Sequence, residues 1–293
     1  MPLPHIVNSA AGYAHTHTII LLHGRDSDAE EFALEFFECE ESIPDNVDAT
    51  NSPVDRRTIQ ALFPTVRWVF PPAEPLRSER FGVEISQWFD MWAAEDPQAR
   101  SQTQLPGLQA SVGRLCRVVE EEETLLPRSR IVLGGISQGF ATALATLFAD
   151  GRGGFAGLCG FSSWIPLADG TASAISQESP RDQLVAMQRM YGGSNTCRQE
   201  ELSPLPQLTR IPILLEHCTD DGVIAVDNGI RMRETLLGLG FRDVEWREYD
   251  TGGHWINEPR GVDDLVRFLR RVMKTTTIDL SPTTAETPTI SRS

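Results

Sequence analysis

The chain has 293 residues, of which 40% are hydrophobic, enough to bury one large core or two smaller ones. Its formal net charge is −15, from 26 basic and 41 acidic residues, which argues against nucleic acid or an anionic membrane as the main partner. No apolar run approaches the roughly 18 residues of a membrane-spanning helix, and the first residues lack the pattern of a secretory signal. We therefore expect a cytoplasmic protein with reduced thiols and without stable membrane insertion.

The predicted elements alternate between strands and helices. A β-branched strand at 17–24 precedes a helix at 27–39, in which Ser27 is a candidate N-cap with Glu30 three residues further on. This alternation predicts right-handed βαβ crossovers and a mostly parallel sheet with helices on both faces. The remaining elements, in chain order, are a strand at 66–72, a helix at 102–126, a strand at 130–135, a helix at 138–149, strands at 154–162 and 211–217, a helix at 226–239, a strand at 243–249 and a helix at 259–274.

The pattern contains no internal repeat and no linker between the first strand and residue 274. We therefore predict one domain at 17–274, preceded by an N-terminal segment at 1–16. The stretch at 275–293 is rich in Thr, Ser and Pro and has few large apolar side chains, so we expect a disordered C-terminal tail.

A glycine-flanked serine lies where the strand at 130–135 turns into the helix at 138–149. The stretch Gly135-Ile136-Ser137-Gln138-Gly139 matches G-x-S-x-G, in which a strained strand-to-helix turn exposes the serine hydroxyl above the sheet edge. The two glycines are expected because strand and helix approach too closely there for side chains. The pentapeptide alone is also compatible with a serine packed in a tight turn, so the case for a nucleophile depends on partners elsewhere in the chain.

Candidate partners follow in the chain order serine, acid, histidine. The loop after the strand at 211–217 contains Asp220 and Asp221, and the loop after the strand at 243–249 contains His254. Both loops follow strand carboxyl ends, where open α/β sheets place their sites. Ser137 would then have a base, His254, and an orienting acid, for which Asp220 and Asp221 compete.

A serine nucleophile also needs donors for the oxyanion of the tetrahedral intermediate. One donor is expected from the backbone N–H of Gln138, the residue after the serine. The other is expected from the loop after the first strand, most simply from Arg25.

No metal or other cofactor is expected. His15, His17 and His23 lie close in the sequence, but no H-E-x-x-H helix and no carboxylate spacing completes a ligand set. The five cysteines, at 39, 116, 159, 197 and 218, show no CxxC spacing, and Cys218 beside the acid loop is interpreted as a small buried hydrophobe.

Over about 17–272 the chain resembles the acyl-protein thioesterase, or phospholipase/carboxylesterase, branch of the α/β-hydrolases. The resemblance is carried by "LLHGRDSD" against H-G-x-G-D, by "GGISQG", by "FSSWIPL" at 161–167 and by "SQWFD" at 86–90. It implies an α/β-hydrolase fold with a minimal lid. The acid loop "HCTDDGVI" resembles H-G-x-x-D-x-V-[VI], which favours Asp221 over Asp220. The chain departs from the family pattern at Arg25 and Asp26, which replace a small or apolar pair, and at Cys218, where glycine is usual.

The leading hypothesis is a serine hydrolase that cleaves carboxylic esters or thioesters through an acyl-enzyme, with Ser137, Asp221 and His254 as the triad. Its substrates would be small esters or acylated molecules, S-acyl proteins included. One alternative is a non-catalytic binding protein that has kept this fold, since fold does not imply function, and another is a peptidase of the same fold. Four apolar residues are candidate walls of an acyl pocket: Trp88, Trp164, Ile224 and Trp255.

Overall fold

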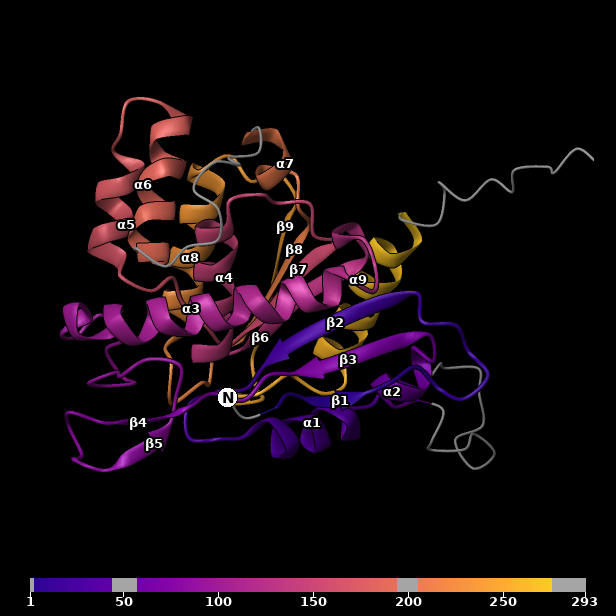
Figure 1. Cartoon of the computed structure of the whole chain (residues 1–293). Helices are drawn as coiled ribbons and strands as arrows, with labels where there is room; N and C mark the ends of the chain where they lie inside the picture. The colour runs from indigo at the N-terminus through magenta and orange to yellow at the C-terminus, as the bar shows by residue number, and fades with distance from the viewer. Residues whose placement is uncertain (1–2, 44–56, 194–204, 276–293) are drawn as a thin grey trace, which may run out of the picture.

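A mostly parallel sheet runs through the centre of the molecule (Figure 1). The structure is a computed structural model that describes residues 3–43, 57–193 and 205–275. In these residues the strand order is β1-β3-β2-β6-β7-β8-β9, and every neighbouring pair is parallel except β1 with β3. The strands are β1 (His5–Val7), β2 (His17–Leu22), β3 (Val66–Phe70), β6 (Ile131–Ile136), β7 (Gly157–Phe161), β8 (Ile213–Cys218) and β9 (Val244–Tyr249).

Helices cover both faces of this sheet (Figure 1). They enclose two separate clusters of buried side chains. One face carries α3 (Ser101–Glu123), α4 (Gln138–Asp150), α5 (Ala168–Ile175), α6 (Pro180–Gly192) and α8 (Val226–Gly238). The other face carries α1 (Ala29–Glu38), α2 (Ile59–Leu62) and α9 (Arg260–Thr275). The remaining elements are a two-stranded hairpin of β4 (Pro75–Arg77) and β5 (Glu84–Ser86), the short helix α7 (Leu205–Thr209) and a 3-10 turn at Arg128–Arg130.

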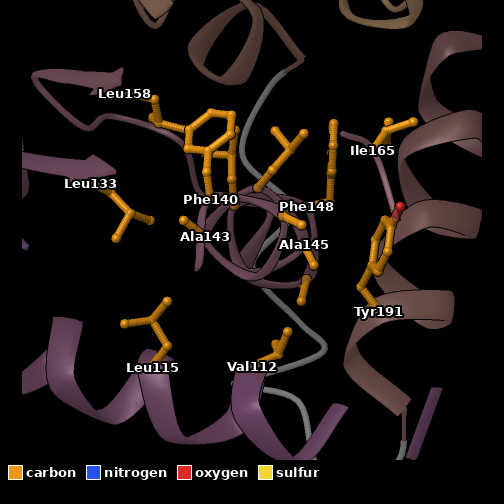
Figure 2. Packing of buried hydrophobic residues seen from close by; sticks show 14 of the residues in the cluster. Val112, Leu115, Leu133, Phe140, Ala143, Ala145, Phe148, Leu158, Ile165 and Tyr191 are labelled. Carbon is orange, nitrogen blue, oxygen red and sulfur yellow. The ribbon is translucent and has the colours of Figure 1, made fainter. Parts of the chain in front are cut away.

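Helix α4 is buried along its whole length, which explains its alanine-rich composition. Figure 2 shows Phe140, Ala143, Ala145 and Phe148 of α4 surrounded by side chains from β6, β7, α3 and α6. The alanines among the α4 positions let the sheet and the flanking helices approach the helix closely. The residue that precedes α4 is therefore attached to one of the most constrained elements of the molecule.

The sheet with helices on both faces confirms the predicted fold class, and each predicted strand and helix is present within a few residues of its expected bounds. The predicted N-cap of the first helix is wrong. Helix α1 begins at Ala29 and is capped by Asp28, whose Oδ1 accepts from the amides of Glu30 and Glu31 at 2.9 Å each. Ser27 lies one residue too early to reach these amides.

Several short elements were not predicted. Strand β1, inside the segment 1–16 that we expected to precede the domain, pairs with β3 at the sheet edge. Helices α5 and α6 pack against each other and α6 against α4, and neither contributes a residue to the lining of the cavity that contains Ser137. Helix α9 ends at Thr275, and the tail expected beyond it lies outside the described residues. Among the described helices, none combines the length and the apolar character needed to cross a membrane.

Candidate active site

Ser137 occupies the turn between β6 and α4 in a backbone conformation that non-glycine residues rarely adopt. Its φ is 55° and its ψ is −126°, and its side chain and backbone are only 5% exposed. The turn is held from both sides: the Ser137 amide donates to the carbonyl of Phe161 at 2.8 Å, and the hydroxyl of Ser163 donates to the Ser137 carbonyl at 2.7 Å. Surrounding hydrogen bonds thus sustain the strained conformation that G-x-S-x-G predicts.

The flanking glycines are explained by the end of β2. A Cβ on Gly139 would lie 2.3 Å from the carbonyl oxygen of Leu22 and 2.5 Å from that of His23. A Cβ on Gly135 would lie 2.5 Å from the same oxygen of Leu22. The crowding expected from the sequence is therefore present, but it comes from the neighbouring strand rather than chiefly from contact between β6 and α4.

Asp221 and His254 are in direct contact. Nδ1 of His254 lies 2.8 Å from Oδ2 of Asp221, and the other oxygen, Oδ1, accepts from the amides of Val223 and Ile224 at 2.8 and 2.9 Å. Burial by itself raises the pKa of the Asp221 carboxyl. Hydrogen bonds from His217 and His254 lower the pKa and outweigh the effect of burial, so the pKa lies well below its usual value. The carboxyl group is therefore an anion held in place by donors on both oxygens.

Asp220 makes different contacts from its neighbour. Its two oxygens accept from the amides of Gly252 and Gly253, at 3.2 and 2.8 Å. Asp220 thus fixes the loop that carries His254, while Asp221 contacts the imidazole itself.

His217, at the end of β8, is a residue of this site that our sequence reasoning did not assign. Its Nε2 lies 2.8 Å from the carbonyl oxygen of Ile224 and 3.3 Å from Oδ2 of Asp221, and its side chain is 1% exposed. Because a carbonyl and a carboxylate only accept hydrogen bonds, Nε2 must carry a proton. The signal was available, since His217 is the first residue of the acid-loop block "HCTDDGVI".

The two expected oxyanion donors are backbone amides beside Ser137. In the part of the chain that the structure describes, the N–H groups of Gln138 and Arg25 have no hydrogen-bond partner. The loop before Arg25 is close to the serine, because a Cβ on Gly24 would lie 3.7 Å from Cβ of Ser137. Nε2 of His23 accepts from the Ala73 amide at 3.0 Å, so its Nδ1 carries the proton and donates to the Gly24 carbonyl at 2.7 Å.

A cavity of about 390 Å³ opens at these residues. Ser137 and His254 both line it, as do Ile224 and Trp255, two of the four residues expected in an acyl pocket. Phe81 and Ile85 bring the β4–β5 hairpin to its wall. Further lining residues are Gly24, Arg25, Asp26, Ser27, Phe32, Glu35, Met91, Ala94, Ile136 and Val223.

The expectation that Trp88 and Trp164 wall this cavity is wrong. Both side chains are buried, and neither lines the cavity. The indole Nε1 of Trp88 donates to the carbonyl of His23 at 2.9 Å, so this ring supports the loop from within the core. Trp164 borders a separate hollow of about 350 Å³ between α5 and α8. A larger hollow of about 670 Å³ runs along α9 and contains none of the candidate site residues.

The described residues contain no group of three or more His, Cys, Asp and Glu side chains arranged to hold a metal ion. His15, His17 and His23 all have pKa values lowered by burial, which is consistent with structural roles.

Comparisons with known proteins agree with the fold and with the sequence blocks. The sequence model of the family described as phospholipase/carboxylesterase matches residues 48–197. A curated acyl-protein thioesterase 1 from Yarrowia lipolytica is 30% identical over 280 residues, which cover 94% of this chain and 100% of the relative. A second acyl-protein thioesterase 1, from Gibberella zeae, is 24% identical over 267 residues, which cover 89% of this chain and 92% of the relative.

Solved structures share the fold at lower sequence identity. Acyl-protein thioesterase 2 from Zea mays superposes with a TM-score of 0.62 at 19% identity, covering 93% of this chain and 100% of that one. Esterase PE8 superposes with a TM-score of 0.60 at 23% identity, covering 92% of this chain and 98% of that one. The chain therefore belongs to the phospholipase/carboxylesterase family of α/β-hydrolases.

Proposed function

We propose that this protein is a serine hydrolase that cleaves carboxylic esters or thioesters, with Ser137, His254 and Asp221 as its catalytic triad. The observation that carries the proposal is the 2.8 Å contact between His254 and Asp221, made at a cavity that His254 shares with the strained Ser137. The names of the curated relatives, acyl-protein thioesterases, support the same reaction class.

In the proposed first step, Oγ of Ser137 attacks the acyl carbon of the substrate while Nε2 of His254 accepts the hydroxyl proton. The contact of Nδ1 with Asp221 leaves Nε2 as the basic nitrogen, and the carboxylate stabilises the imidazolium that forms. The amides of Gln138 and Arg25 would donate to the developing oxyanion. Collapse of the intermediate breaks the bond to the leaving group, which takes the proton from His254 and departs as an alcohol or a thiol.

The second step hydrolyses the acyl-enzyme. His254 removes a proton from a water molecule, the resulting hydroxide attacks the ester carbonyl of the acylated Ser137, and the same two amides stabilise the second oxyanion. Collapse returns the proton to Oγ and releases the carboxylic acid. Apart from the substrate and this water molecule, the groups named in both steps belong to the polypeptide.

The cavity walls favour an apolar acyl group. Phe32, Ile85, Met91, Val223 and Ile224 present hydrocarbon to a space of about 390 Å³, and burial of an acyl chain against them is favourable. Small esters and acylated molecules, S-acyl proteins included, are therefore the proposed substrates. A cytoplasmic location is proposed with them.

Fluorophosphonate labelling tests the proposal directly, because the reagent forms a stable adduct with an activated serine. Wild-type protein should be labelled at Ser137 and should hydrolyse p-nitrophenyl esters, whereas Ser137→Ala should do neither. A folded wild-type protein that neither reacts with the probe nor turns over any ester would instead indicate a non-catalytic binding protein.

A further inference from the structure

Arg25 brings a fixed guanidinium group to the cavity that contains Ser137. Its Nε donates to Oε1 of Gln87 at 2.9 Å, and Gln87 is itself fully buried, with its Nε2 donating to the carbonyl of Leu76 at 3.2 Å. The guanidinium carbon lies 5.6 Å from the ring centroid of Phe81. One edge of the group is thus anchored and one face is covered, and Nη2 is buried, which leaves Nη1 as the terminal nitrogen for a partner in the cavity.

The half-buried guanidinium of Arg25 has no ion-pair partner among the described residues. Nη2 is buried and has no hydrogen-bond partner among these residues, and no described carboxylate lies within 4.0 Å of the guanidinium. A partly buried charge without a paired anion is unfavourable, and an anion that enters the cavity would relieve this cost. The arrangement therefore leaves the guanidinium able to pair with an anion in the cavity.

Neighbouring carboxylates do not fill this role. Burial lowers the pKa of the Arg25 guanidinium, and the carboxylates of Asp90 and Asp26 offset only part of this effect. Oδ2 of Asp90 accepts from the amide of Glu79 at 2.9 Å, and its Oδ1 is buried without a hydrogen-bond partner in the described part of the chain, so Asp90 acts on Arg25 through its charge rather than through an ion pair. Asp26 and Glu35, the two carboxylates on the cavity lining, are exposed side chains whose charge is screened by solvent.

We propose that Arg25 forms a subsite for a negatively charged group of the substrate, so that the enzyme prefers anionic esters or thioesters. This inference rests on the proposed function, in which Ser137 is the nucleophile. Among the lining residues Arg25 is the only lysine or arginine, and its Nη1 can donate to an oxygen of a carboxylate. In a protein of net charge −15, such a local cation favours the entry of an anion.

Two matched ester pairs test the subsite and locate it. In the first pair the acyl group carries the charge: the mono-p-nitrophenyl ester of adipate against p-nitrophenyl hexanoate. In the second pair the leaving group carries it: p-carboxyphenyl hexanoate against p-carbamoylphenyl hexanoate. The measured quantity is kcat/KM for the anionic ester divided by kcat/KM for its neutral partner. Arg25→Met should lower this ratio by about 10- to 100-fold in the pair whose charged group lies at the subsite. This fold-change corresponds to the free energy of a hydrogen bond to a charged group.

Arg80→Met is the matched control. Arg80 also stacks on Phe81, at 5.4 Å, but it does not line the cavity and is paired with Glu95. Removing this charge should leave the ratio within about two-fold of wild type in both pairs. If the kcat/KM ratio falls equally in the Arg80 and Arg25 variants, the preference reflects the overall charge of this surface rather than a contact with Arg25. That result would overturn the subsite.

The kcat/KM ratios of the wild-type enzyme test the subsite even if Arg25→Met does not fold. If wild type favours the neutral ester in both pairs, at low and at high salt, the subsite does not exist. The two proposals also fail differently: hydrolysis of neutral esters with fluorophosphonate labelling of Ser137, but no selection by charge, overturns only this inference. Absence of both labelling and hydrolysis overturns the proposed function.

Discussion

Nε2 of His217 lies 3.3 Å from Oδ2 of Asp221, the carboxylate oxygen that also contacts Nδ1 of His254 at 2.8 Å. Both His217 and Asp221 have almost fully buried side chains, with 1% and 0% exposed. His217 is also fixed by the carbonyl of Ile224, so it can hold the carboxylate without turning away. The acid of the proposed triad is thus oriented by a second histidine.

Replacing His217 by phenylalanine should lower kcat by about 10-fold or more, because the buried carboxylate loses a donor and its orientation. Because His217 acts through Asp221 and is not among the residues lining the cavity, the loss should fall on kcat with little change in KM. Steady-state kinetics at neutral pH separate the two constants.

His217→Gln provides the rescue control, since an amide N–H can replace the imidazole donor. A purely structural role would lower the melting temperature of both variants while leaving kcat of the folded enzyme unchanged. A folded His217→Phe protein with the kcat of wild type would contradict the positioning role.

Ser137→Ala and His254→Ala should each abolish ester hydrolysis to a similar extent, because members of a triad act as a unit. Ser137→Gly should be equally inactive but more stable than Ser137→Ala, by about 1 kcal/mol, because glycine tolerates a φ of 55° without strain. Urea unfolding compares the two serine variants. Equal stability would mean that the turn is less strained than its backbone angles indicate.

The adjacent aspartates offer a matched pair. Asp221→Asn should lower kcat by roughly 10³- to 10⁴-fold, on the precedent of other triads, because it favours the wrong imidazole tautomer. Asp220→Asn should cost far less, since it removes an acceptor for the Gly252 and Gly253 amides but leaves the imidazole contact intact. Initial rates with one ester suffice, and the reverse order would show that Asp220 is the acid.

Stability should fall as the pH drops below about 6.5. Burial, with help from Arg130 and His15, lowers the pKa of His17 from 6.5 to about 4 in the folded protein. Between these values the unfolded chain binds more protons than the folded one, so stability is complete above about pH 6.5 and is lost as the pH falls toward 4.

The lowered pKa of His17 should contribute about 1–2 kcal/mol to the free energy of unfolding at neutral pH, after allowance for partial solvent screening. Urea unfolding at pH 7 and pH 4.5 measures the loss, and His17→Gln should show a smaller difference between the two conditions. An identical pH dependence in the variant would assign the acid lability to other groups.

The sequence by itself determined the order and type of the main elements and the position of Ser137. Alternating strands and helices carry their own periodic signals, and the unbroken apolar run before Gly135 marks β6 because a strand buried on both faces has no polar positions. The chain order of Ser137, the acid loop and His254 is readable for the same reason, since each follows a recognisable strand.

Only the tertiary structure decided which polar group meets which partner and which aromatic residues face the cavity. Asp220 and Asp221 are identical side chains on one loop. Only the position of the loop after β9 determines that Asp220 contacts a backbone amide and Asp221 contacts the imidazole of His254. Trp88 and Trp255 are equally apolar, yet one is buried beneath the His23 loop and the other lines the cavity. These outcomes depend on pairs of residues far apart in the chain, and local propensity contains no information about such pairs because the sheet order alone brings them together.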